Sequence, residues 1–168
     1  MIVNRMTTLA ALAFAGLLSA GAPAFAGPEV NTSTGIVIAD GKPASGLAVH
    51  GYDVVAYFTA GKPVKGDSKF AAQHGAATYR FATKAHLEAF QANPEKYVPA
   101  YGGFCAFGVS VNAKFDGNPE NWKIVDGRLY LNLDSGIQQN WLKDVPGNIK
   151  KAEAIWPGIK DKAPADIK

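Results

Sequence analysis

The feature that most restricts how this chain can fold is its single cysteine, Cys105, in a sequence of 168 residues. One cysteine cannot form a disulfide within the chain, so crosslinks cannot replace a packed interior. The composition meets this requirement, because 48% of the residues are hydrophobic and 11% are aromatic. A chain of this length therefore predicts one domain held together by a hydrophobic core. The unpaired thiol also leaves a disulfide-linked dimer open, and the oligomeric state is not predicted.

The N-terminal segment has the order of parts of a secretory signal peptide. Arg5 supplies a positive charge, residues 6–26 carry no charge, and Ala24 and Ala26 have the spacing of a cleavage site. We therefore expect residues 1–26 to be removed and the protein to act in the periplasm or outside the cell. An uncleaved membrane anchor is the alternative, and the small residues before the cleavage site favour removal. No membrane association is expected after cleavage.

The charge of the chain is close to balanced, with 17 Lys and Arg against 14 Asp and Glu and a net charge of +3. The basic residues are spread along the sequence, apart from the pair Lys150 and Lys151. This distribution argues against nucleic acid or an anionic membrane as a partner.

Turn and capping signals divide the chain after an N-terminal arm, residues 27–46, into short elements. Alternation predicts a strand over residues 77–82, and Thr83 is a good N-cap for a helix over 84–92. The Asp126-Gly127 pair lies between two alternating segments and predicts a β-hairpin.

The C-terminal part of the chain predicts further short elements. One helix is expected from Asp134 or Ser135 to Lys143 and another over residues 147–155, before a flexible tail over 158–168. The paired glycines of Tyr101-Gly102-Gly103 predict a close backbone approach or a tight turn into a buried strand. Together these elements predict an α+β fold: a small single domain with short antiparallel strands and three to four short helices.

Few residues of this sequence could carry chemistry. The candidates are Cys105, Asp53 with its neighbour Tyr52, and the histidines His50, His74 and His86. Cys105 together with one or two histidines could bind Cu(I) or Zn(II). A buried cysteine that packs between Phe104 and Phe107 is the simpler interpretation. A thiol nucleophile paired with a histidine is a third.

The other candidates also have structural interpretations. His86 falls early in the expected helix, where solvent would surround it, and His50 and His74 each precede a glycine in a turn. Asp53 lies inside an apolar run, where its carboxylate is expected to bind backbone N–H groups at a turn. No hydrolase, zinc-protease or nucleotide-binding motif occurs. No enzymatic activity is therefore expected.

The order of several motifs resembles the exported, stand-alone branch of the YHS domain family, over residues 47–157. The more specific motifs are Asn93-Pro94-Glu95-Lys96-Tyr97 and Tyr101-Gly102-Gly103-Phe104-Cys105. The other matching segments are Gly51–Phe58, Tyr79–Thr83, Trp122–Asn132 and Asn148–Pro157.

The resemblance implies a small α+β fold with a treble-clef-like core. In metal-binding members it also implies a site made of three cysteines. Ala56 and Ala82 stand where the first two cysteines would be, and His86 stands where the third would be. The resemblance thus leaves His86 as a ligand, with Cys105 as a new candidate from a motif of this branch.

Two functions follow from these observations as hypotheses. The first is a periplasmic metal-binding or metal-handling module, for copper before zinc, that uses Cys105 and His86 and extends to His50. Its partner would be a metal ion or a metal-handling protein. The alternative is a metal-free domain that kept the YHS fold and binds a small ligand or a partner protein through its Tyr- and Phe-rich surface.

Overall fold

The chain folds into one α+β domain, as the sequence predicts. The computed structural model describes residues 29–33, 37–39, 42–44, 46–75 and 77–168. The predicted signal peptide lies outside these residues. No helix in the described part of the chain is long and apolar enough to cross a membrane.

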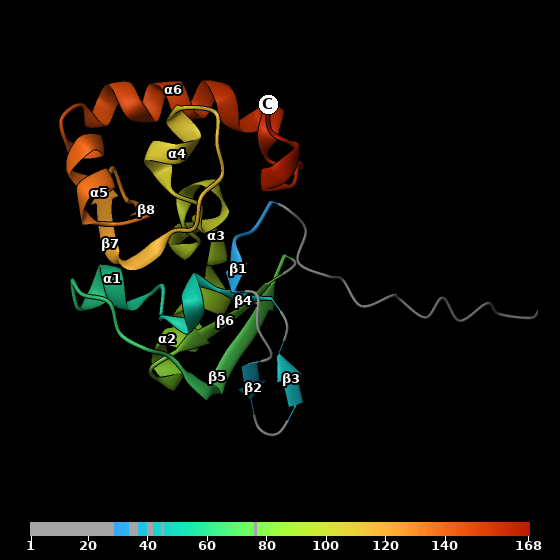
Figure 1. Ribbon diagram of the computed structural model, residues 1–168. Coiled ribbons are helices and arrows are strands. Elements are labelled where there is room, and N and C mark those ends of the chain that lie inside the picture. The colour runs from blue at the N-terminus through green and yellow to red at the C-terminus, as the bar shows by residue number, and fades with distance from the viewer. Residues whose placement is uncertain (1–28, 34–36, 40–41, 45, 76) are drawn as a thin grey trace, which may run out of the picture.

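The main sheet has four strands in the order β1, β4, β6, β5 (Figure 1). The strand β1 (Thr32–Ser33) lies antiparallel to β4 (Leu47–Ala48), which is parallel to β6 (Ala77–Phe81). The long strand β5 (Asp67–His74) pairs antiparallel with β6 and forms the edge. Alternate residues of β6 are buried, which confirms the pattern of its sequence.

The region predicted as an N-terminal arm contributes to two sheets. Within it, β1 joins the edge of the main sheet, while β2 (Val37–Ala39) and β3 (Lys42–Ala44) form a separate antiparallel pair. Asn31 attaches this region to the rest of the domain, because its backbone N–H donates to the carbonyl of Gly102.

The helix that follows β6 begins where the sequence predicts. Thr83 accepts a hydrogen bond from the His86 backbone N–H at 3.1 Å and caps α2 (Lys84–Ala92). The next helix, α3 (Pro94–Tyr97), has proline in its first turn, where the missing N–H needs no partner.

Two left-handed turns connect the elements of the middle of the chain. The turn η1 (Val49–Gly51) precedes α1 (Ala56–Thr59), and η2 (Ala100–Gly103) precedes α4 (Ala106–Ser110). The prediction of a buried strand after Gly103 is wrong. Cys105 accepts a hydrogen bond from the Gly108 N–H and starts a helix instead.

The hairpin predicted at Asp126-Gly127 is present. It consists of β7 (Asn118–Val125) and β8 (Arg128–Asn132), and both turn residues have positive φ, 48° at Asp126 and 74° at Gly127. Asp134 then caps α5 (Ser135–Leu142) by accepting from the Ile137 N–H at 2.8 Å.

The last helix, α6 (Val145–Ile159), extends beyond the predicted end at Ile155 and includes Pro157. Lys114 supports this longer helix, because its ammonium donates to the carbonyls of Lys160 and Lys162 at 2.6 and 2.8 Å. These bonds hold the start of the C-terminal segment, in which η3 (Pro164–Asp166) is the final element.

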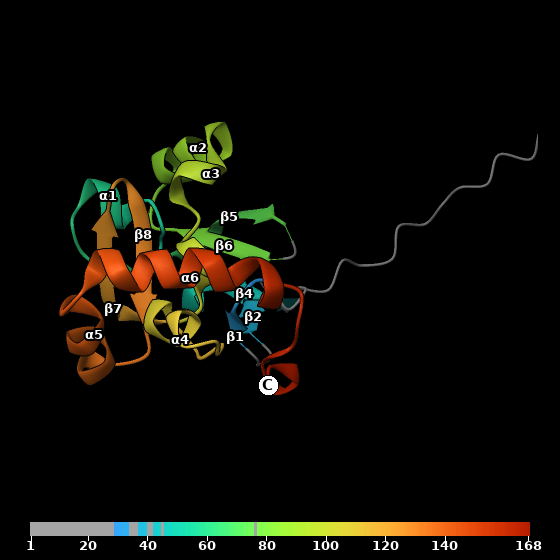
Figure 2. The same ribbon diagram turned by 90° about the horizontal axis from the view of Figure 1, so that it is seen from above.

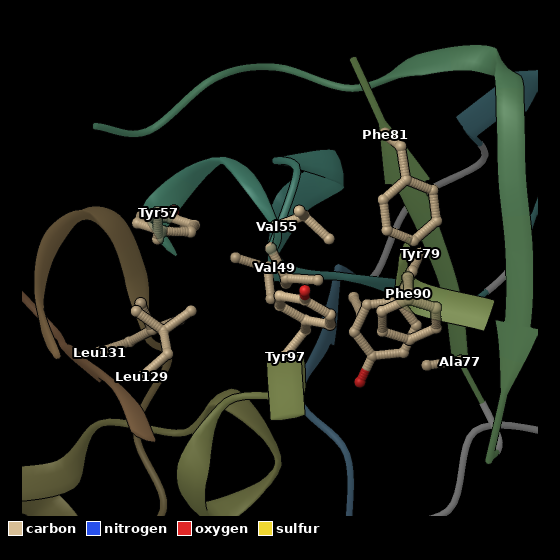
Figure 3. Close-up of a cluster of buried hydrophobic side chains, with 12 residues drawn as sticks. Val49, Val55, Tyr57, Ala77, Tyr79, Phe81, Phe90, Tyr97, Leu129 and Leu131 are labelled. Carbon is tan, nitrogen blue, oxygen red and sulfur yellow. The ribbon is translucent and has the colours of Figure 1, made fainter. Parts of the chain in front are cut away.

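Two buried clusters make up the core. The first joins the main sheet and α2 to the β7–β8 hairpin, and Figure 3 shows Phe81 and Phe90 on one side and Leu129 and Leu131 on the other. The second lies under α6, around the fully buried Trp141. Figure 2 shows α6 crossing over α4 and the hairpin. The domain therefore has a sheet layer and a helical layer, with the hairpin between them.

Candidate functional site

Cys105 is fully buried at the start of α4. Its thiol lies 3.8 Å from Asn132 Oδ1 and accepts from the Gly108 N–H at 3.4 Å. Burial raises the pKa of the thiol, and nearby backbone N–H groups oppose the shift only in part. A buried thiol with a raised pKa is a poor nucleophile and a poor metal ligand. The interpretation of Cys105 as a packed core residue is confirmed.

His86 lies on α2 and connects two other side chains. Its Nδ1 lies 2.6 Å from Asp53 Oδ2, and its Nε2 lies 3.2 Å from Thr59 Oγ1. The imidazole is 22% exposed, whereas Asp53 has no exposed surface. Both ring nitrogens therefore have protein partners. The expectation that solvent surrounds His86 is wrong, because Asp53 and Thr59 bind its ring.

His50 lies in the left-handed turn η1, and its partners differ from those of Cys105 and His86. Its Nε2 lies 2.9 Å from Asp116 Oδ1, which also accepts from the Asn31 side chain at 2.6 Å. This pair is half-exposed. The three predicted ligands thus have three separate sets of partners.

The prediction of a copper or zinc module built on Cys105, His86 and His50 is wrong. Among the described residues, no group of three or more His, Cys, Asp or Glu side chains is arranged to hold a metal ion. The physical reasons are that the core desolvates the only thiol and that Asp53 and Thr59 occupy the two nitrogens of His86.

Asp53 lies among the three positions, Ala56, Ala82 and His86, at which the YHS resemblance implies a metal site. Its Oδ1 accepts from the N–H groups of Val55 and Ala56, and its Oδ2 accepts from the N–H of Ala82. Ala56, Ala82 and His86 therefore all contact one carboxylate. The expectation that Asp53 binds backbone N–H groups is confirmed, and a network of hydrogen bonds fills this position.

A pocket of about 310 Å³ lies where the sheet layer meets α6. Val98, Pro99 and the rings of Tyr79 and Trp156 give it apolar walls. It is lined by Glu29, Val30, His74, Gly75, Tyr79, Glu95, Val98, Pro99, Gly102 and Trp156. This volume is in the range of small-molecule sites, and the mixture of apolar walls with a few polar groups is typical of them.

The charged groups of the pocket are mainly acidic. Glu95 lies 3.3 Å from His74, and its carboxylate contributes to the raised pKa of Tyr79, of which burial is the larger cause. Glu29 is the second carboxylate, and no Lys or Arg is found among the described lining residues. Lys114 is not a lining residue, but its ammonium lies 5.2 Å from the Trp156 ring and interacts electrostatically with Glu29. The Glu95 side of the pocket is therefore where the field favours a further positive charge.

Gly102 fixes one wall of the pocket. Its φ is 60°, and a Cβ at this position would overlap the backbone carbonyl of Glu29. Only glycine allows the chain at Glu29 to approach η2 this closely. The close approach predicted for the paired glycines is confirmed, and it brings the backbone of Glu29, a lining residue of the pocket, against η2.

The sequence did not point to several of these residues. Glu29 and Glu95 lie far apart in the sequence, so no spacing pattern connects them. Thr59 is the last residue of the four-residue helix α1, and no motif includes it. Glu95 lies in the Asn-Pro-Glu-Lys-Tyr motif, which is the one sequence signal that falls at the pocket.

Fold and site together define a small α+β domain with an acidic pocket and, separately, a buried aspartate paired with a partly exposed histidine. Comparison of the chain with protein-family models, curated proteins and solved structures gives no match. The YHS resemblance therefore stays a prediction that rests on the motifs quoted above.

Proposed function

We propose that this protein is a small-ligand-binding domain whose pocket accepts a molecule with a positively charged group. The observation that carries the proposal is the pairing of two carboxylates, Glu29 and Glu95, with apolar and aromatic walls in one pocket. This is the small-ligand form of the alternative left open by the sequence. The N-terminal segment alone is the basis for placing the function in the periplasm or outside the cell.

The shape of the pocket supports a compact ligand. Carboxylates at its rim can pair with an ammonium group, while Val98, Pro99 and Tyr79 can contact the carbon skeleton. Choline is a suitable probe, because it joins a permanent positive charge to a small apolar volume.

Isothermal titration with choline tests the proposal against two matched probes. One is the uncharged alcohol in which carbon replaces the choline nitrogen, and the other is a carboxylate of similar size. We expect choline to bind at least about tenfold more tightly than the uncharged alcohol, a difference of ~1.4 kcal/mol. The carboxylate should bind most weakly of the three.

Two variants, Glu95→Gln and Glu88→Gln, distinguish the effect of a pocket carboxylate on choline affinity from the effect of general surface charge. Glu88 is an exposed residue of α2 that pairs with Lys84 at 2.9 Å and does not line the pocket. We expect Glu95→Gln to reduce choline affinity and Glu88→Gln to leave it unchanged. Equal affinity for the charged and uncharged probes, or equal effects of the two variants, would contradict the proposal.

A further inference from the structure

Thr59, His86 and Asp53 form a continuous chain of hydrogen-bonding side chains away from the pocket residues. Thr59 Oγ1 lies 3.2 Å from His86 Nε2, and His86 Nδ1 lies 2.6 Å from Asp53 Oδ2. The order is hydroxyl, imidazole, carboxylate. This is the arrangement by which an imidazole takes the proton of a hydroxyl nucleophile while a buried carboxylate holds the ring.

The buried carboxylate assigns the two ring nitrogens. The Asp53 oxygens already accept backbone N–H groups from Val55, Ala56 and Ala82, so the carboxylate acts as an acceptor toward His86 as well. His86 Nδ1 is then the donor, and in the neutral ring the lone pair of Nε2 faces the Thr59 hydroxyl. Asp53 is therefore a positioning residue for the ring.

The hydroxyl end of this chain is open to solvent. Thr59 is an exposed residue at the end of α1. The Thr59 hydroxyl donates to the Val55 carbonyl at 3.2 Å, and His86 Nε2 lies at the same distance from Oγ1. A rotation about the Cβ–Oγ1 bond therefore turns the single hydroxyl proton from Val55 to His86 before the imidazole takes it. A small molecule can thus reach Thr59 Oγ1, while His86 is only 22% exposed behind it.

We propose that Thr59 is an acylation site for small activated esters, with His86 as its general base. Thr59 Oγ1 forms a bond to the ester carbonyl carbon, and His86 Nε2 takes the hydroxyl proton. The bond from that carbon to the leaving oxygen breaks, and His86 returns the proton to the leaving alcohol or phenol. Water then attacks the threonyl ester with His86 again as base, which releases a carboxylic acid and restores Thr59. This proposal departs from the expectation of no enzymatic activity.

The probe that tests this proposal is p-nitrophenyl acetate, with release of p-nitrophenolate as the rate measurement. Peptide mass spectrometry of quenched samples locates the acetyl group. Thr59→Val keeps the shape of the side chain without the hydroxyl, and Thr59→Ser restores a hydroxyl. We expect His86→Gln to slow the reaction about a hundredfold, the usual loss when a general base is removed. Thr59→Val removes the nucleophile and should leave residue 59 without an acetyl group, whereas Thr59→Ser should retain the reaction.

His50→Gln is the matched control, because His50 is also a partly exposed histidine that contacts an aspartate, Asp116, at 2.9 Å. We expect this variant to react like the parent protein, with the acetyl group on Thr59. Acetylation of lysines alone, or equal rates in the parent and Thr59→Val, would overturn the proposal. If His86→Gln fails to fold, the exposed pair Thr59→Val and Thr59→Ser still decides the outcome.

Discussion

Asp53 is a charged side chain with no exposed surface, and hydrogen-bond donors surround both of its oxygens. Backbone N–H groups at Val55, Ala56 and Ala82 join α1 to the end of β6, and His86 adds α2. A buried carboxylate is tolerated when its acceptors are satisfied in this way. A single residue thereby connects three elements.

Asp53→Ala should destabilise the domain strongly. The change leaves buried N–H groups and the His86 ring without their partner, so we expect the free energy of unfolding to fall by about 3–5 kcal/mol. Urea unfolding followed by circular dichroism measures this loss.

Asp67→Ala is the matched control for this experiment. The Asp67 carboxylate also accepts a backbone N–H two residues on, from Lys69 at 2.9 Å, but in an exposed position. Water can replace that bond, so the loss should stay below about 1 kcal/mol. Similar losses in the two variants would show that burial of Asp53 is not what makes it important.

Cys105 should be chemically inert in the folded protein. Its thiol is fully buried and its pKa is raised by burial. We expect reaction with a disulfide reagent such as Ellman's reagent to be at least about a hundredfold slower than in urea-unfolded protein. Fast labelling of the native protein would contradict the placement of Cys105 in the core and reopen a thiol-based function.

At the scale of elements, the two left-handed turns η1 and η2 set the geometry around the pocket and Asp53. Val49, His50 and Gly51 have φ of 49°, 52° and 79°, and these values are unusual for a β-branched residue such as Val49. Asn31 and Asp116 connect the two turns, through Gly103 and His50. Such strained conformations persist only where their surroundings hold them.

Gly102→Ala should disrupt the contact between η2 and the N-terminal segment. The new methyl group would meet the Glu29 carbonyl and would also sit at a φ of 60°. Gly127→Ala is the matched control, since Gly127 has a φ of 74° with nothing within 4 Å of a Cβ. We expect Gly127→Ala to cost about 1–2 kcal/mol from backbone strain alone.

The loss in Gly102→Ala should exceed that of Gly127→Ala, because the segment at Glu29 must move as well. Choline affinity in the same variants gives a second measurement, and only Gly102→Ala should weaken it. Equal losses of stability in both variants would show that the close approach of Glu29 contributes little.

At the scale of the whole molecule, buried tyrosines connect different elements across the core. Tyr57 packs edge to face on Trp122 of the hairpin with ring centroids 5.0 Å apart, and its hydroxyl donates to the Pro119 carbonyl at 3.0 Å. Tyr79 packs against Phe90 at 4.9 Å. Burial raises the pKa of Tyr57 and of Tyr79 above the ordinary value of 10.0.

These shifts predict a loss of stability in alkaline solution. Above about pH 10 the unfolded chain releases tyrosine protons that the folded chain retains, so stability falls as pH rises. Each such tyrosine lowers the free energy of unfolding by up to about 1.4 kcal/mol per pH unit above that point. Urea midpoints at neutral pH and in alkaline buffer measure the trend. The midpoint of the Tyr57→Phe variant should fall less steeply with pH than that of the parent protein. A midpoint unchanged at alkaline pH would contradict this prediction.

Local signals in the sequence determined much of this fold. Thr83 and Asp134 mark helix starts, Asp126-Gly127 marks the hairpin, and the alternation of residues 77–82 marks a strand, because each signal acts through neighbours in the chain. They were sufficient for the α+β class. Local signals misjudged the end of α6, since Lys114, distant in sequence, binds the carbonyls that follow it.

Only the tertiary structure decided the candidate sites. The sequence could name Cys105, His86 and His50 as chemically able residues, but whether they meet depends on contacts between distant segments. Packing buried Cys105, while Asp53 and Thr59 engaged His86 and Asp116 engaged His50. The acidic pocket likewise exists only because the backbone at Glu29 lies against Gly102, so that Glu29 and Glu95 line one cavity. Composition and spacing identify which groups are present, and long-range packing determines which of them share a site.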